Sequence, residues 1–161
     1  MSMLLYLIRV DEPSLRTLLQ DSSHLADMLD RDDLRMIDID KDWDGILFLL
    51  TGTSLAGCTD HPLSHIFFSG QAVDEHQDFG YGPAHYLRPA QVSALSAQLA
   101  AIEPVSLYAR YSPALMAQED VYPSGWDEEE DADALVRSYS RIRDFYAAAT
   151  RDGEAIITLL V

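Results

Sequence analysis

Two segments near the two ends of the sequence are apolar at nearly every position, and they constrain the fold more than any other feature. They are residues 4–10, Leu-Leu-Tyr-Leu-Ile-Arg-Val, and residues 155–161, Ala-Ile-Ile-Thr-Leu-Leu-Val. A strand that is apolar on both faces needs cover on both sides, so it belongs inside a sheet and not at its edge. The sequence therefore predicts a small sheet in which both of these strands are central.

The residues between these strands carry mainly helical patterns. Asp11 followed by Pro13 predicts a helix start, with the acid as the cap and proline in the first turn. Other helices are expected in the parts of the chain where apolar residues recur at steps of three and four: residues 25–29, 43–51, 89–102, 105–118 with a break at Pro113, and 135–149. Residues 36–40 suit a short strand, residues 51–62 read as a loop, and residues 63–68 suit a short helix or strand. These patterns predict one α+β domain over residues 1–161, with helices packed on the central sheet.

Composition excludes several classes of protein. A chain of 161 residues that is 48% hydrophobic can bury a real core, which rules out disorder. Cys58 is the only cysteine, so neither a disulfide framework nor a cysteine-rich zinc site can form. One lysine and a net charge of −16 argue against a nucleic-acid binder. No apolar run is long enough for a membrane span, and no signal peptide is recognisable, so we expect a cytoplasmic protein.

The densest charge in the sequence is the acidic run from Asp127 to Asp133, just before the longest predicted helix. One interpretation is a solvated helix N-terminus, where acids complement the helix dipole. The other is an acidic face that attracts a basic protein partner and speeds its association.

Asp38 and Asp40 flank Ile39 and would share one face of an extended segment. Two such carboxylates could share a proton for acid–base chemistry or hold a divalent ion. Either could instead cap the helix that begins near Trp43, and capping is the role we favour for Asp40.

Histidine and cysteine offer weaker candidates for chemistry. His61 and His65 stand four residues apart and could reach one metal ion, but proline replaces the glutamate that zinc-hydrolase helices carry after the first histidine. A structural role is therefore favoured for both, and no metal or other cofactor is expected. Cys58 has no catalytic signature around it and is expected to be inert.

Two aromatic segments rich in glycine and proline stand out. Gly80–Leu87, which contains Tyr81 and His85, reads as a tight turn, and residues 122–126 place Tyr122 and Trp126 in a similar loop. Aromatic side chains in such loops either recognise a partner or hold the loop onto the core. The sequence leaves these two roles open.

Several of these segments resemble the bacterial family called DUF1877, or YfbM-like. The resemblance rests on the run Asp38-Ile39-Asp40-Lys41-Asp42-Trp43 with Leu49-Leu50-Thr51-Gly52-Thr53, on His61-Pro62-Leu63-Ser64, on Gly80–Leu87, and on Tyr122-Pro123 with Trp126. It covers nearly the whole chain. It implies a small single-domain α+β protein without an assigned activity, and it brings no catalytic residues. Family members often carry histidines in the helix after the tryptophan, where this chain has Asp44 and Phe48, which weakens an enzymatic interpretation.

Two functions are consistent with these observations. The first is a non-catalytic, acidic protein-interaction module with a basic partner, in one form an immunity-like or antitoxin-like protein that covers the active site of a basic toxin. The second is a small-molecule-binding protein or hydrolytic enzyme, whose pocket would gather two carboxylates and a tryptophan with the two aromatic loops. The candidate site residues are Asp38, Asp40, Trp43, Tyr81, His85, Tyr122 and Trp126.

Overall fold

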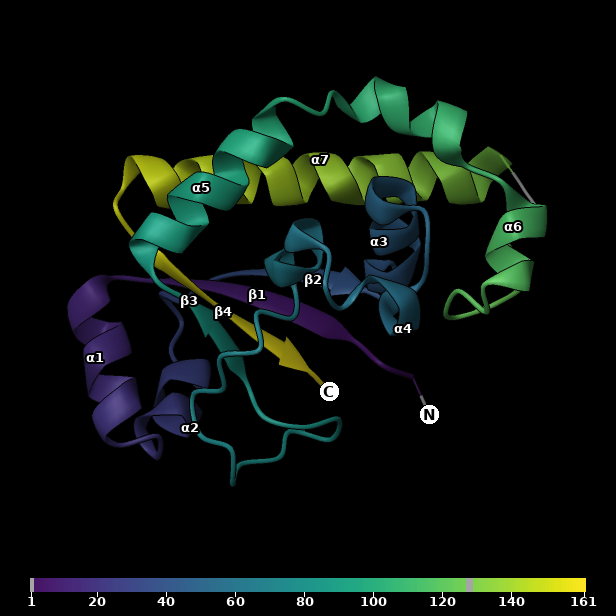
Figure 1. Cartoon of the computed structure of the whole chain (residues 1–161). Coiled ribbons are helices and arrows are strands. Elements are labelled where there is room, and N and C mark those ends of the chain that lie inside the picture. Colours follow the sequence, from purple (N-terminus) through teal and green to yellow (C-terminus); the bar gives the residue numbers. More distant parts are fainter. Residues whose placement is uncertain (1, 127–128) are drawn as a thin grey trace.

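A computed structural model describes residues 2–126 and 129–161 and shows an α+β architecture around one antiparallel sheet (Figure 1). Within the described residues the sheet has four strands, in the spatial order β2-β1-β4-β3. Their bounds are β1 (Leu5–Val10), β2 (Arg35–Asp40), β3 (His85–Leu87) and β4 (Ala155–Leu160). The first and last strands are therefore the central pair, as the sequence predicts.

Helices and loops cover both faces of this sheet (Figure 1). The bounds of the helices are α1 (Glu12–Gln20), α2 (His24–Leu29), α3 (Trp43–Thr51), α4 (Leu55–Cys58), α5 (Pro89–Ala100), α6 (Pro113–Gln118) and α7 (Glu129–Arg151), with 3-10 helices η1 (Pro62–Ile66) and η2 (Pro104–Arg110). Leu5 and Leu7 of β1 pack in the core formed with α3, α5 and α7. Ile8 and Val10 of the same strand pack in a second core with α1 and α2. None of the helices in the described ranges has the length and apolar character needed to cross a membrane.

The ends of two helices follow directly from local sequence. The Asp11 carboxylate accepts a hydrogen bond from the Ser14 N–H at 2.8 Å, which caps α1, and Pro13 stands in its first turn. Helix α3 ends at Gly52, whose φ of 87° lies in the left-handed region that glycine adopts without strain. Both ends match the sequence analysis.

Three segments differ from expectation. Residues 51–62 contain the short helix α4 in place of a continuous loop, and residues 104–110 form the 3-10 helix η2. Gly80–Leu87 ends in strand β3, where a turn was expected. A three-residue strand is too short to show an alternating pattern, and β3 forms because β4 offers a free edge, with Tyr86 opposite Ile157.

A partly buried network of ion pairs lies at one end of the sheet. Arg9 of β1 and Arg35 of β2 are directly opposite each other in the register, a pairing of like charges that is unfavourable alone. The Glu154 carboxylate, whose side chain is 3% exposed, lies between them: Arg9 Nε donates to Glu154 Oε1 at 2.9 Å, and Arg35 forms an ion pair with Oε2. Asp152 accepts a further bond from Arg9 at 2.6 Å.

We predict that Glu154→Gln lowers the free energy of unfolding by about 3 kcal/mol, because it leaves two guanidinium groups with too little compensating charge. Urea unfolding at neutral pH measures the change. Asp152→Asn is the matched control, since Asp152 is 40% exposed and its pair should contribute less than about 1 kcal/mol. Equal effects of the two substitutions would contradict this account of the network.

Candidate functional site

Three of the sequence-predicted site residues meet in a continuous line of rings near the two chain ends. The Trp43 ring stacks on Tyr122, with centroids 5.4 Å apart and planes 23° apart. Phe68 packs edge-on against Trp43 at 5.6 Å, and His85 packs edge-on against Phe68 at 6.4 Å. We call Tyr122, Trp43, Phe68 and His85 the aromatic row. Phe68 was not singled out from the sequence, where it read only as part of an apolar segment.

The polar atoms of this row bind the protein's own backbone. Trp43 Nε1 donates to the Met3 carbonyl oxygen at 3.1 Å, and the Met3 N–H donates to the Tyr122 hydroxyl at 2.8 Å. His85 Nδ1 accepts the Gly70 N–H at 3.1 Å, and burial lowers the pKa of His85, which favours its neutral form. These bonds hold the segment before β1 and the loop before β3 onto the core.

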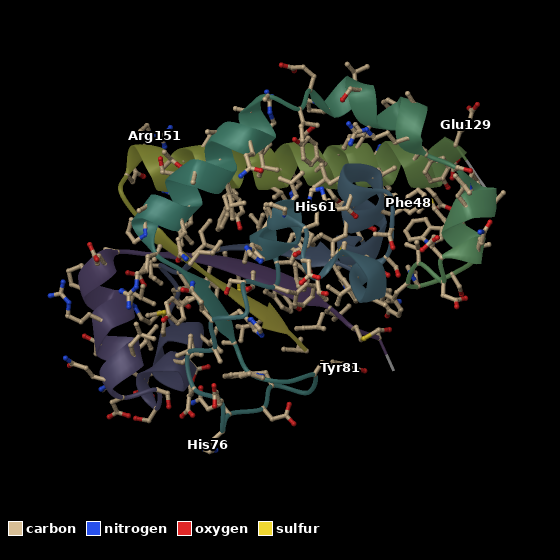
Figure 2. The ribbon with its side chains drawn as sticks, in the orientation of Figure 1. Phe48, His61, His76, Tyr81, Glu129 and Arg151 are labelled. Atoms are coloured by element: carbon tan, nitrogen blue, oxygen red, sulfur yellow. The ribbon has the colours of Figure 1, made fainter. Side chains whose placement is uncertain are left out.

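A small cleft lies beside His85 at the edge of the row. Its lining includes Phe68, Tyr81 and His85, and its volume is about 30 Å³. That is room for a water molecule or two, far below the several hundred Å³ of a typical small-molecule site. Tyr81 is 38% exposed on the loop that precedes β3 (Figure 2). Tyr81 and His85 thus share a cleft that is too small for a substrate.

Asp44 is a buried carboxylate that stands out in the sequence only as a departure from the family that the chain resembles. It is 4% exposed, and its two oxygens accept the Leu55 N–H at 2.7 Å and the Tyr122 N–H at 2.9 Å. Burial raises the pKa of Asp44, and the two hydrogen bonds oppose that rise. Asp44 therefore holds the Tyr122 loop and the start of α4 against α3. The only signal in the sequence was an acid within an otherwise apolar helix.

Trp126 packs at the point where α3 and α7 approach each other. Its Nε1 donates to the Val121 carbonyl oxygen at 3.1 Å. A Cβ atom at Gly45 would lie 3.0 Å from the Trp126 ring and 2.8 Å from Leu135, so glycine is needed for this close approach. The exposed side of Trp126 lines a cleft of about 190 Å³ between α6 and residues 121–126, together with Asp120.

Asp38 and Asp40 are both exposed on the edge strand β2 and are not part of the aromatic row. Asp38 is opposite Tyr6, whose side chain packs in the second core, whereas Trp43 packs in the core on the other face of the sheet. Asp40 is opposite Leu5, beyond a register shift between Leu5 and Tyr6. Burial raises the pKa of Tyr6, and the nearby negative charges of Asp38 and Asp40 raise it further. The structure thus places Asp38 on the face of the sheet opposite Trp43, whereas the small-molecule hypothesis puts it beside the aromatic loops.

Neither carboxylate caps α3, so the capping role favoured for Asp40 is wrong. Asp38 Oδ1 accepts the Asp40 N–H at 2.7 Å, and Asp40 has a left-handed φ of 53° that ends the strand. The N-terminal flanking residue of α3 is Asp42, whose carboxylate accepts the Ser138 hydroxyl at 2.6 Å. The cap position is shifted because the backbone turns at Asp40 before the helix begins.

The surroundings of His61 and Cys58, the weaker candidates for chemistry, indicate structural roles. His61 Nδ1 accepts the Leu63 N–H at 3.1 Å and so caps η1. Cys58 is buried, and burial raises the pKa of its thiol, which disfavours the reactive thiolate. Across residues 2–126 and 129–161, no group of three or more His, Cys, Asp or Glu side chains is arranged to hold a metal ion.

We predict that Asp44→Asn lowers the free energy of unfolding by about 1–3 kcal/mol, because its NH2 group, a donor, replaces one of the two oxygens that accept the backbone N–H groups. Urea unfolding followed by circular dichroism and by tryptophan fluorescence tests this, since Trp43 stacks on the loop that Asp44 holds. Asp144→Asn, an exposed change on α7, is the control and should have little effect. An unchanged stability would show that Asp44 does not hold the loop.

We also predict that Asp42→Asn changes how stability depends on pH. Burial raises the pKa of Asp42 despite the Ser138 hydrogen bond, so the native state binds this proton more tightly than the unfolded state does. Protonation of Asp42 stabilises the folded protein fully at pH values below the ordinary aspartate pKa. This stabilisation is lost as the pH rises through the raised pKa of Asp42 in the folded protein.

Asp42→Asn should therefore raise stability at pH 7 by on the order of 0.5 kcal/mol. The gain should shrink to zero as pH falls below the ordinary aspartate pKa. Urea unfolding at several pH values measures this, and Asp27→Asn, on exposed α2, controls for the loss of one negative charge. A gain that Asp27→Asn reproduces would instead reflect net charge alone.

Comparison with known proteins agrees with this architecture. The family model described as "Domain of unknown function (DUF1877)" matches residues 1–159. The crystal structure of YfbM from Escherichia coli, a protein of unknown function, is similar in fold, with a TM-score of 0.78 and 23% sequence identity over 98% of this chain and 99% of that one. No curated protein matches. Because the family model spans nearly the whole sequence, this chain belongs to the DUF1877 family.

Proposed function

We propose that this protein is a non-catalytic binding module, and that it docks a basic protein partner on an acidic surface at one end of the molecule. We define the acidic end as the residues that directly follow α6 together with the first turns of α7. The acids there are Glu119, Asp120, Glu129, Glu130, Asp131 and Asp133. Asp127 and Glu128, which belong to the acidic run of the sequence, lie outside the described residues.

Helix α7 separates its charges along its length. Acids occupy its first turn and Arg151 its last, and Figure 2 shows Glu129 and Arg151 at opposite ends of this long helix. The helix dipole accounts for that arrangement within one helix. It does not account for Glu119 and Asp120, which directly follow α6 and add charge at the same end of the molecule, where α6 lies near the start of α7 (Figure 1). The negative charge here therefore comes from two separate segments of the chain.

Exposed apolar side chains accompany these acids. Val105 is 73% exposed, Tyr108 43% and Leu115 51%, on η2 and α6. The Tyr108 hydroxyl donates to Asp133 Oδ1 at 2.6 Å, which places its ring beside the start of α7. Protein interfaces commonly combine aromatic and aliphatic contacts with a charged rim.

The observation that carries the proposal is the cleft beside Trp126. Its volume of about 190 Å³ suits one side chain, and its lining includes both Trp126 and Asp120. A lysine or arginine side chain matches this pair, because its stem packs on the indole and its charge meets the acid. The surroundings of Trp126 thus favour a basic partner, as the net charge of −16 does. An inhibitor that covers a basic toxin is one form that such a module takes.

We predict that the triple variant Asp120→Asn, Glu129→Gln, Glu130→Gln loses the partner, because it removes three charges from the acidic end. The tagged protein is incubated with cell lysate at low and moderate salt, and retained proteins are identified by mass spectrometry. A basic protein should be retained at low salt by the wild type, and less at moderate salt. The triple variant should retain several-fold less of it.

The control variant Asp27→Asn, Asp30→Asn, Asp32→Asn removes the same charge from exposed positions around α2, and it should retain the partner fully. Leu115→Ser tests the apolar part of the surface and should weaken retention without a change in charge. Equal losses from the two triple variants would mean that only overall charge attracts the protein, and the proposed docking surface would then be wrong.

A further inference from the structure

Three arginines of this strongly acidic chain line one cavity at the opposite end of the molecule from α6. Arg9 comes from β1, Arg31 from the turn after α2, and Arg35 from the start of β2. The cavity has a volume of about 350 Å³, and the acids Asp11 and Asp33 also line it. This is enough room for a small ligand. Three arginines thus line a single cavity in a protein of net charge −16, although Glu154 and Asp152 pair with two of them.

The guanidinium groups differ in how far the protein already uses them. Arg9 is 12% exposed, binds Glu154 and Asp152, and lies over the Phe145 ring at 5.8 Å. Arg31 is 57% exposed and binds only Asp33, through Nε at 3.0 Å and Nη2 at 2.8 Å. Arg35 is 53% exposed and pairs with Glu154 through Nη2.

Donors therefore remain for a ligand. Among the hydrogen bonds of the described residues, Nη1 of Arg31 and both Nε and Nη1 of Arg35 have no protein acceptor. Guanidinium groups bind carboxylates and phosphates through paired N–H donors. The Asp11 carboxylate caps α1, so it is already engaged with the Ser14 N–H. The two exposed arginines thus present unused donors beside a cavity.

A second cavity continues from the first. It has a volume of about 380 Å³ and shares Ser14, Met28 and Arg31 with its neighbour. Leu18 and Met28 contribute apolar side chains to it, between α1 and α2. The two cavities share lining residues and together form a groove. Arginines line one end, and the other end is lined by Leu18 and Met28 together with the polar residues Thr17, His24 and Asp27.

We propose that this groove binds a small molecule that carries a carboxylate or phosphate group at one end and an apolar body. Arg31 and Arg35 bind the anionic group, and Arg9 acts as a positioning residue, because it holds the Glu154 carboxylate that orients Arg35. Leu18 and Met28 contact the apolar body. Asp33 competes with the ligand for Arg31. This site is separate from the acidic end and does not depend on a protein partner.

The test uses four small anions and one cation as probes, with amide chemical shifts of the whole chain as the readout. Phenyl phosphate and phenylacetate carry both parts of the proposed ligand, inorganic phosphate and acetate carry only the anion, and benzylamine carries a cation on a similar body. Saturable shifts confined to residues 9–18 and 24–35 with a phenyl anion support the site, and the tighter of the two identifies the oxyanion. Absence of saturable shifts with both phenyl anions overturns the proposal. Equal binding of the bare anions overturns the assignment of the apolar cavity.

Two substitutions with opposite expected effects test the role of Arg31. Arg31→Gln should weaken binding about tenfold, because it removes a charged donor, and its exposed side chain pairs only with Asp33. Asp33→Asn should tighten binding several-fold, because it frees Arg31. Arg16→Gln, on the exposed side of α1, is the charge-matched control and should leave binding unchanged. Equal weakening by Arg31→Gln and Arg16→Gln, or binding of benzylamine as tight as that of the phenyl anions, would overturn the proposed site.

Discussion

Strands β1 and β4 pair along their full length, with Leu5 opposite Leu160 and Val10 opposite Ala155, and the residues on both of their faces are buried. Each fully buried leucine or isoleucine side chain contributes roughly 1.5–3 kcal/mol, so the free energy available from covering both faces is large. Helices α3, α5 and α7 cover one face of these two strands, and α1, α2 and the loop before β3 cover the other face. The positions of the candidate sites follow from these two layers.

The ion-pair network around Glu154 contributes both to the stability of the sheet and to the proposed anion site. Arg9 and Arg35 are opposite each other on neighbouring strands, and their charges are tolerable because one buried carboxylate serves both. That arrangement uses most donors of Arg9 and leaves most of those of Arg35 free. A residue pair that stabilises the end of the sheet thereby also presents a cation to the adjacent cavity.

The central strands, the Asp11 cap and the Gly52 helix end were predictable, because each depends on residues close together in the sequence. Strand β3 was not, since three residues show no periodicity and its pairing with β4 depends on a distant segment. The predicted capping role of Asp40 was wrong because the left-handed backbone at Asp40 shifts the start of α3 along the chain. Helix and strand propensities of the residues do not reveal such a turn of the backbone. The same limit applies to Asp44, whose hydrogen-bond partners come from two separate loops.

Among the candidate site residues, Trp43, Tyr122 and His85 lie together in the aromatic row. The sequence could not show that Asp38 faces away from that row, because the face on which a residue of an edge strand lies depends on the register of that strand. Nor could it show the arginine cavity. Arg31 and Arg35 are ordinary exposed residues in the sequence, and only the pairing of β1 with β2 brings Arg9 beside them.

The pairing of the first strand with the last also sets the order in which the molecule can assemble during translation. Arg9 and Glu154 are 145 residues apart, so β1 leaves the ribosome roughly 10 s before its central partner at ordinary synthesis rates. During that interval β1 can pair only with β2, and its other edge, flanked by apolar side chains on both faces, stays open. An open apolar edge is a template for wrong pairing. The nascent chain is therefore most vulnerable to aggregation just before β4 emerges, whatever the stability of the finished fold.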